Sequence, residues 1–314
     1  MKKAGRSSSG LSVERRNNRN GFLFALPWIL GFLGFSVYPL VTSLYYSFTE
    51  FNPIVAPKWV GWSNYIDVFS DPLVYTSLKN TLFIAFVSTP VNLFIALILA
   101  SIVNQKFRGR GIVRTIFFLP SVIPMIAATM IWIWMFDPTY GFINNTLHIF
   151  GVNGPSWLVD PRYTKWSLLL MGTWCTGTTM MICLAALQDV PVSYYESAEI
   201  DGANVFQKFF KITLPCIAHV LVYQAILNFI NAFQYFTQVY VITSASSGGG
   251  AGEASGGPEN SILMYPLYIF HNAFVYMKMG KASAMAWILF IIVSVITFFM
   301  VKASRKATEN AGGE

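Results

Sequence analysis

Residues 195–215 read YESAEIDGANVFQKFFKITLP, a polar and charged stretch between two long apolar runs of the chain. Just before and within it, Ser193 and Glu196 have the S-x-x-E spacing of a capping box, in which each side chain satisfies a backbone N–H at the start of a helix. This spacing predicts a short helix that begins near Tyr194.

A sharp turn is predicted in the middle of the same stretch. Asp201 and Gly202 should end the first helix, because glycine adopts a positive φ without a Cβ clash and aspartate can cap the helix that follows. From about Ala203, helical spacing resumes until Pro215, which lacks a backbone N–H. The residues at this spacing are Phe206, Phe209, Phe210 and Thr213, with Lys208 and Lys211 among them. The pattern predicts two short helices that meet at a corner, although on spacing alone they could equally lie on a membrane surface.

The composition is that of a membrane protein. Hydrophobic residues make up 54% of the chain and charged residues 11%, whereas soluble domains carry about 25% charged residues. Six runs contain no Asp, Glu, Lys or Arg, and each is long enough to cross a hydrocarbon core of ~30 Å. These predicted spans are 22–48, 80–103, 115–136, 166–187, 216–242 and 282–301. The predicted fold class is an all-α polytopic membrane protein.

The basic residues predict the orientation. Fifteen of the 21 Lys and Arg residues lie in the two tails and in the loops after the second and fourth spans, and the other three loops hold six. By the positive-inside rule, both termini and loop 188–215 lie in the cytoplasm. Residues 1–20 are predicted as a disordered cytoplasmic tail, 21–303 as the membrane domain and 304–314 as a second cytoplasmic tail. A secretory signal is disfavoured because the first apolar run is too long, and the net charge of +7 requires no nucleic-acid partner.

The fourth predicted span is rich in small side chains, which let helices approach closely. We therefore expect it to pack deep in the bundle. The small residues are Gly172, Thr173, Cys175, Thr176, Gly177, Thr178 and Thr179.

The fifth predicted span carries polar residues at spacings of four, three, four and three, which place them on one face of a helix. Amides in hydrocarbon are costly unless they are paired or face water. Hydrogen bonding between helices is one explanation, and a polar wall of a pathway for hydroxyl-rich, uncharged solutes is the other. The candidate pathway residues are Gln224, Asn228, Asn231, Tyr235 and Gln238.

The segments between spans differ in character. Residues 51–79 should form an extracytoplasmic loop, with Trp59, Trp62 and Tyr65 near the membrane interface. Residues 244–258 are Gly- and Ser-rich and are predicted to be flexible. Residues 262–277 are apolar but too short for a span, so we expect an interfacial or re-entrant helix.

No sequence motif for catalysis or metal binding is present. The chain lacks G-x-x-x-x-G-K-[ST], H-E-x-x-H and C-x-x-C, so it is not expected to hydrolyse ATP alone or to bind a metal. The histidines and cysteines are scattered and are expected to be structural: His148, His219, His271, Cys175, Cys183 and Cys216. Ion-coupled transport of a neutral polar solute stays as an alternative function, although the spans lack the carboxylates that such carriers use.

The pattern E-S-A-x-x-D-G-A at 196–203, followed by I-T-L-P at 212–215, resembles the cytoplasmic loop of binding-protein-dependent ABC importer permeases. Ser197 stands where that family usually has Ala. The segments VGWSNYIDVFSDP at 60–72 and FFLPSVIPMIAATMIWIWMF at 117–136 are similar to the carbohydrate-uptake group of the family. The resemblance covers most of 22–302.

This resemblance implies a type I ABC importer permease fold in a bacterial or archaeal inner membrane. The chain would work as a heterodimer with a related permease, two cytoplasmic ATPase subunits and an extracytoplasmic solute-binding protein. ATP and Mg²⁺ would bind to the ATPase subunits, and no cofactor would bind to this chain. Its ATPase-coupling residues would be Glu196, Ser197, Ala198, Asp201, Gly202, Ala203 and Phe206.

Overall fold

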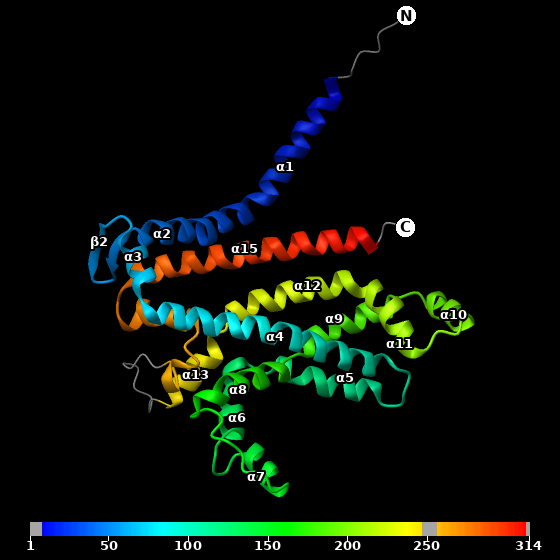
Figure 1. Ribbon diagram of the computed structural model, residues 1–314. Helices are drawn as coiled ribbons and strands as arrows, with labels where there is room; N and C mark the ends of the chain where they lie inside the picture. Colours follow the sequence, from blue (N-terminus) through cyan, green and yellow to red (C-terminus); the bar gives the residue numbers. More distant parts are fainter. Residues whose placement is uncertain (1–7, 247–255, 312–314) are drawn as a thin grey trace, which may run out of the picture.

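The computed structural model describes residues 8–246 and 256–311. Within these residues the regular secondary structure is helical apart from one two-stranded sheet. Long helices lie side by side along one direction, while α1 (Ser8–Phe32) and α7 (Phe142–Ile149) project from opposite edges of the bundle (Figure 1). We call the end that carries the sheet the hairpin end. The opposite end, which carries α10 (Val192–Ile200) and α11 (Val205–Lys208), is the corner end. The predicted helical membrane fold is confirmed at the level of its class.

The first predicted span lies in one long, bent helical rod. α1 (Ser8–Phe32), the π-helical turn η1 (Leu33–Val37) and α2 (Tyr38–Ser47) follow one another without a break. The predicted disorder of the N-terminal tail is therefore wrong for residues 8–20, which are helical. Extending an existing helix adds one hydrogen bond for each residue fixed, so the helix can continue beyond its apolar part. Residues 1–7 of the predicted tail lie outside the described residues.

Three further long rods make up the bundle. They are α4 (Pro72–Asn104), the run from α11 (Val205–Lys208) through η3 (Phe209–Thr213), α12 (Leu214–Phe233) and α13 (Thr237–Ser246), and α15 (Met279–Ala311). With the first rod they are the four described helices that are long and apolar enough to cross a membrane. The fifth-span rod is interrupted over 234–236, between α12 and α13.

The third and fourth predicted spans are bent pairs rather than single helices. The pair of α5 (Arg110–Phe118) with η2 (Leu119–Val122) and α6 (Met125–Met135) turns by 100°, and the pair of α8 (Pro161–Trp174) and α9 (Gly177–Gln188) turns by 50°. The first bend falls in the sequence LPSVIP, where prolines disfavour a continuous helix. The described chain therefore has six spans only if each bent pair counts as one.

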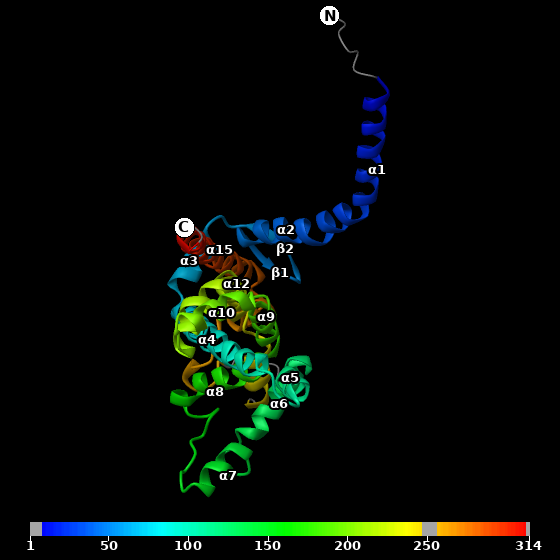
Figure 2. The same ribbon diagram turned by 90° about the vertical axis from the view of Figure 1, so that its right-hand side faces the viewer.

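α4 lies at the centre of the packing. It contacts α9 and α12, α12 contacts α15, and α15 contacts α2 (Figures 1 and 2). The small residues of the fourth span include a close approach of the kind expected. A Cβ on Gly177 would lie 2.7 Å from the carbonyl oxygen of Phe117, so α9 begins directly against the backbone of α5.

The hairpin end is capped by the first inter-span loop. β1 (Thr49–Asn52) and β2 (Val55–Trp59) form an antiparallel pair, and α3 (Ser63–Ser70) leads into α4. Trp62 and Tyr65 pack around Phe48 with ring centres 5.1 and 5.3 Å from it, and Trp59 lies 5.6 Å from the same ring. The three predicted interface aromatics thus belong to one cluster.

Two further inter-span loops contain short helical elements. α7 (Phe142–Ile149) lies between the third and fourth predicted spans, and residues 256–278 contain η4 (Pro258–Asn260), α14 (Tyr265–Phe270) and the π-helical η5 (His271–Val275). Of the stretch predicted to be flexible, residues 247–255 lie outside the described residues, whereas Gly256, Gly257 and Pro258 are folded.

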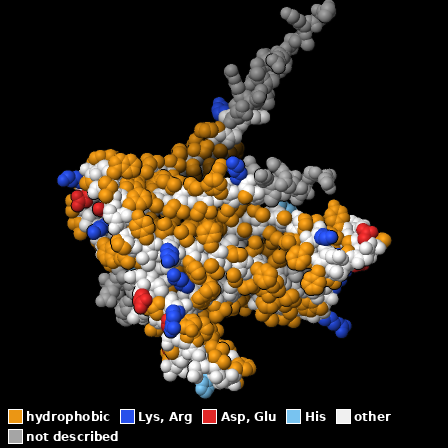
Figure 3. Space-filling model, in the orientation of Figure 1, with side chains coloured by type: hydrophobic (Ala, Val, Ile, Leu, Met, Phe, Trp, Pro, Cys, Tyr) orange, Lys and Arg blue, Asp and Glu red, His pale blue; other side chains and the backbone are white. Residues whose placement is uncertain are grey.

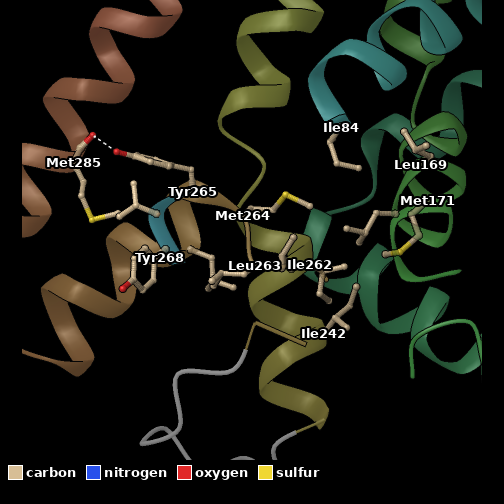
Figure 4. Close-up of a cluster of buried hydrophobic side chains, with 14 of the residues drawn as sticks. Ile84, Leu169, Met171, Ile242, Ile262, Leu263, Met264, Tyr265, Tyr268 and Met285 are labelled. Carbon is tan, nitrogen blue, oxygen red and sulfur yellow. Dashed lines mark hydrogen bonds between the residues drawn. The ribbon is translucent and has the colours of Figure 1, made fainter. Parts of the chain in front are cut away.

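Residues 262–265 form a wedge in the core rather than an interfacial surface. Ile262, Leu263, Met264 and Tyr265 are at most 2% exposed. They lie between side chains of α4, α8, α13 and α15, and the Tyr265 hydroxyl donates a hydrogen bond to the carbonyl of Met285 (Figure 4). An interfacial helix is therefore wrong for residues 262–265, whereas Phe274, Tyr276 and Met277 at the other end of 262–277 are exposed.

An ion pair at the hairpin end joins Asp71 to Lys281 and also receives a hydrogen bond from Tyr268 of α14. The Lys281 ammonium lies 2.6 Å from Asp71 Oδ2, and the Tyr268 hydroxyl donates to the same oxygen at 2.5 Å. Burial opposes ionisation of Asp71, but the hydrogen bonds from Lys281 and Tyr268 outweigh it and hold the pKa of Asp71 below its usual value. The beginnings of α4 and α15 are thereby joined.

Candidate functional site

The first helix of the corner begins earlier than the capping-box pattern predicts. α10 spans Val192–Ile200, and its N-cap residue is Pro191, with no side-chain capping bond. The prediction of a Ser193–Glu196 capping box is therefore wrong. Because proline already has a φ suited to a helix start, the helix begins before Ser193 and leaves that side chain inside the first turn.

The turn between the helices is a Schellman motif. Gly202 has a φ of +75°. Its N–H donates to the carbonyl of Glu199 at 3.1 Å, and the N–H of Ala203 donates to that of Ala198 at 2.9 Å. These two bonds satisfy the last carbonyls of α10 and require the left-handed residue at Gly202. The prediction that Gly202 forms the corner with a positive φ is confirmed.

The second helix is capped by a residue that the sequence analysis did not single out. Asn204, not Asp201, is the N-cap of α11, and it exchanges two hydrogen bonds of 2.8 Å with Gln207. Asn-x-x-Gln is a variant of the capping box, so this signal was readable. Pro215 does not end the helix, because the π-helical turn η3 precedes it and α12 continues to Phe233.

Two contacts hold the corner in one shape. Lys208 Nζ donates to Glu199 Oε1 at 2.8 Å, joining α11 to α10. This hydrogen bond lowers the pKa of the exposed Glu199. The hydroxyls of Tyr195 and Thr213 share a hydrogen bond of 2.8 Å, which ties α10 to the root of α12. Both contacts therefore join α10 to the fifth-span rod, which begins with α11.

The tip of the corner exposes large apolar side chains. Ile200 is 88% exposed, and Val205 and Phe206 are 75% exposed. Water-exposed apolar patches of this kind mark interaction sites. Of the predicted coupling residues, Ala198 and Ala203 are half-buried under the turn, whereas Glu196, Ser197, Asp201, Gly202 and Phe206 are exposed at its surface.

A second site lies inside the bundle. A cavity of about 450 Å³ is bordered by α4, α6, α8, α9, α12, α13 and the interruption at 234–236. Four of the five predicted pathway residues line it, namely Asn228, Asn231, Tyr235 and Gln238, whereas Gln224 is buried elsewhere. They do not share one uninterrupted helix face, because the helix stops at Phe233 and restarts at Thr237. The interruption turns Tyr235 and Gln238 toward the same cavity as Asn228 and Asn231.

Residues outside the candidate set also border the cavity. They are Asn92 of α4, Thr129 and Trp132 of α6, Thr176 between α8 and α9, and Gln234 in the interruption of the fifth-span rod. Asn92 was predictable, since it is an amide within the apolar second span and follows the same rule for polar groups in hydrocarbon. Among the described residues that line the cavity, none is Asp, Glu, Lys, Arg or His.

Three buried polar atoms of the cavity lining have no hydrogen-bond partner among the described residues. They are Asn92 Oδ1, Asn228 Nδ2 and Trp132 Nε1, and Gln224 Nε2, outside the lining, has none either. Tyr235 differs, because its hydroxyl donates to the carbonyl of Leu168 at 3.2 Å. A buried amide without a partner costs about 1–3 kcal/mol. The cavity is therefore suited to a guest that offers hydroxyl groups or to water.

Comparison with known proteins finds a matching family and related chains that cover most of this chain. Residues 92–309 match the family described as binding-protein-dependent transport system inner membrane component. The chain is 39% identical to the probable ABC transporter permease protein YesP of Bacillus subtilis, over 92% of each chain. It is 33% identical to the lactose transport system permease protein LacF of Rhizobium radiobacter, over 96% of this chain and 99% of LacF.

The fold has a counterpart among solved structures. The crystal structure of a bacterial ABC transporter involved in the import of the acidic polysaccharide alginate contains a chain that aligns with a TM-score of 0.79. The alignment covers 94% of this chain and 99% of that chain at 22% identity, so the likeness concerns the fold. Together with the family match, it identifies the predicted ABC importer permease fold. The chain belongs to the binding-protein-dependent transport system inner membrane components, the permease subunits of ABC importers.

Proposed function

We propose that this chain is one permease subunit of an ATP-driven importer for a sugar or oligosaccharide, and that its α10–α11 corner transmits ATPase movements to the bundle. The observation that carries the proposal is the corner itself. It is a small, internally bonded unit that exposes Ile200, Val205 and Phe206 and is continuous with the fifth-span rod.

The corner has the properties of a docking element. The C-terminal end of α10 and the N-terminal end of α11 are capped internally, so binding requires little further ordering of the turn and retains more of the interaction energy. The apolar tip supplies the area that a groove in an ATPase subunit would bury. Because the Tyr195–Thr213 bond ties α10 to the root of α12, rotation of the corner would be passed to the cavity wall.

The remaining subunits follow from the same proposal. The chain would pair with a second, related permease, two cytoplasmic ATPase subunits carrying ATP and Mg²⁺, and an extracytoplasmic binding protein that delivers the solute. The corner end would face the cytoplasm, in agreement with the distribution of Lys and Arg along the chain. Family membership favours this ATP-driven mechanism over the ion-coupled alternative.

The solute is proposed from the chemistry of the cavity. Amides, hydroxyls and the rings of Trp132 and Tyr235 line it, and no charged side chain does. Hydroxyl groups of a sugar would satisfy Asn92 Oδ1 and Asn228 Nδ2, and the rings would contact its apolar faces. The lactose permease among the relatives agrees with a sugar substrate.

The docking proposal is tested by purifying the tagged chain from detergent-solubilised membranes of its host. Wild type is expected to recover an ATPase whose sequence contains the phosphate loop, together with a second permease. Ile200→Asp combined with Phe206→Asp should lose the ATPase and keep the permease, because charges at the tip cannot enter an apolar groove. Phe142→Asp with Ile149→Asp, at residues similarly exposed on α7, is the matched control. Equal ATPase recovery in the two variants, or a chain that purifies alone and transports solute down an ion gradient, would contradict the proposal.

A further inference from the structure

Two lysines lie on neighbouring helices near the hairpin end. Lys165 Nζ of α8 is 5.4 Å from the centre of the Phe83 ring of α4, and Lys79 precedes Phe83 by one helical turn on α4. Neither lysine takes part in the three ion pairs found among the described residues. Arg162, in the first turn of α8, differs because Asp160 holds it at 2.6 Å.

Lys79 points away from the transport cavity. Ser88 of α4 lines the cavity, and at 3.6 residues per turn it lies about 180° around the helix from Lys79. Lys79 instead shares a stripe with large exposed side chains spaced by four or seven residues. The stripe consists of Tyr75, Lys79, Phe86, Pro90 and Phe94. Apart from Lys79 this surface is apolar or aromatic, as expected of a face turned toward lipid.

Aromatic rings frame the two lysines. Phe83 and Trp166 meet edge to face with ring centres 5.8 Å apart, and Trp166 is 55% exposed. Exposed tryptophans settle where headgroups meet acyl chains, and lysine stems extend along apolar surface to reach that level. Figure 3 shows basic side chains gathered over the hairpin-end parts of α4 and α8, within a mainly hydrophobic face.

We propose that Lys79 and Lys165 bind the headgroup phosphate of an anionic phospholipid in the leaflet at the hairpin end. Two neighbouring ammonium groups repel each other, and a phosphate between them removes that repulsion and accepts charge-assisted hydrogen bonds. A lipid is favoured over a protein carboxylate because Lys79 faces opposite to the cavity, the side on which a second permease would complete the path. The lipid site requires only that the chain spans a membrane, so the proposal does not depend on which solute is transported.

The test measures which lipid the purified full-length chain retains. The protein is exchanged in detergent with equal amounts of phosphatidylglycerol and phosphatidylcholine of identical acyl chains, and bound lipids are counted by native mass spectrometry. Wild type is expected to prefer phosphatidylglycerol by roughly tenfold, since each basic residue near an anionic lipid adds to binding. Lys79→Gln with Lys165→Gln should abolish the preference, and Lys79→Arg with Lys165→Arg should retain it.

Lys58→Gln with Lys278→Gln removes the same charge from other exposed lysines and should leave the preference intact. A wild-type chain without any preference, or equal loss in this control pair, would overturn the proposal. A preference that survives 0.5 M salt in the wild type would overturn it as well, and this arm needs no variant to fold. One further result would overturn the proposal: wild type shows no lipid preference, and the Lys79/Lys165 variant loses a partner subunit from the purified complex. A protein carboxylate would then be the ligand of the two lysines.

Discussion

The corner and the cavity are built in opposite ways. The corner uses residues within about twenty positions of one another, and its capping groups bond within it. The cavity gathers residues from six helices and the interruption at 234–236, and it leaves buried amide atoms of Asn92 and Asn228 without partners. A unit that satisfies itself is suited to transmit movement, whereas a site with unsatisfied groups is suited to receive a guest.

Removing the cavity's polar groups should have the largest effect. Asn231→Leu together with Tyr235→Leu is expected to abolish solute uptake while the complex still assembles, because the wall loses the groups that replace water around a hydroxyl-rich solute. Uptake of labelled oligosaccharide into whole cells measures this, with subunit recovery as the check on assembly. Tyr223→Leu, at an exposed residue of α12 outside the cavity lining, is the control. Unchanged uptake in the double variant would remove the cavity from the path.

Distorting the corner should uncouple ATPase activity from the binding protein, while the complex still inserts into the membrane. Gly202→Val places a branched side chain at a φ of +75°, which costs roughly 1–2 kcal/mol and misdirects α11. We expect the subunit to insert, while the ATPase activity of the reconstituted complex no longer responds to the loaded binding protein. Gly151→Val is the matched control, because Gly151 has a φ of +74° and equally open surroundings in the loop between the third and fourth predicted spans. Normal coupling in Gly202→Val would show that the corner tolerates reshaping.

Breaking the ion pair at the hairpin end should lower the stability of the folded chain. Lys281→Met leaves the largely buried Asp71 carboxylate with only the Tyr268 hydroxyl and a backbone N–H, and breaking a buried pair in this way costs ~3–5 kcal/mol. Thermal unfolding in detergent should therefore shift to lower temperature. Adding Asp71→Asn should recover part of the loss, and an additive decrease would show that the pair is not coupled.

A smaller effect is expected from pH. Because the pKa of Asp71 is lower in the folded chain than its ordinary value of 3.8, its stabilising contribution is complete above that value. The contribution is lost as the pH falls through the lowered pKa. Wild type should lose more unfolding free energy than Asp71→Asn as the pH is lowered from 5 toward 3. Parallel curves for the two proteins would contradict this assignment.

The local features of the corner were largely predictable from sequence. Gly202 was assigned a positive φ because Asp-Gly interrupts a helical pattern, and the structure agrees. The caps were assigned wrongly, since Ser193 and Pro191 offered competing helix starts two residues apart and the Asn204–Gln207 box was overlooked. Because Pro215 lacks an N–H, the sequence predicts that the helix ends there, but the π-helical turn before it accommodates the missing donor.

The features that depend on distant residues were not predictable. The interruption after Phe233 has no proline or glycine to mark it. The length of the apolar run 262–277 predicts an interfacial or re-entrant helix, but it does not predict that Asn80 donates to the carbonyls of Asn260 and Leu263 and holds this segment in the core. Asp71 and Lys281 are 210 positions apart, and no local pattern links them.

The most direct test of the account is a photo-crosslink from the corner in intact membranes. Phe206 is replaced by the photoreactive residue p-benzoylphenylalanine, the membranes are irradiated, and the adducts are identified by mass spectrometry. The account predicts an adduct with an ATPase whose sequence contains the phosphate loop, and none when the same replacement is made at the exposed Phe142 of α7. Adducts with lipid alone at Phe206, or the same ATPase adduct at both positions, would contradict the proposal that the α10–α11 corner couples this permease to its ATPase.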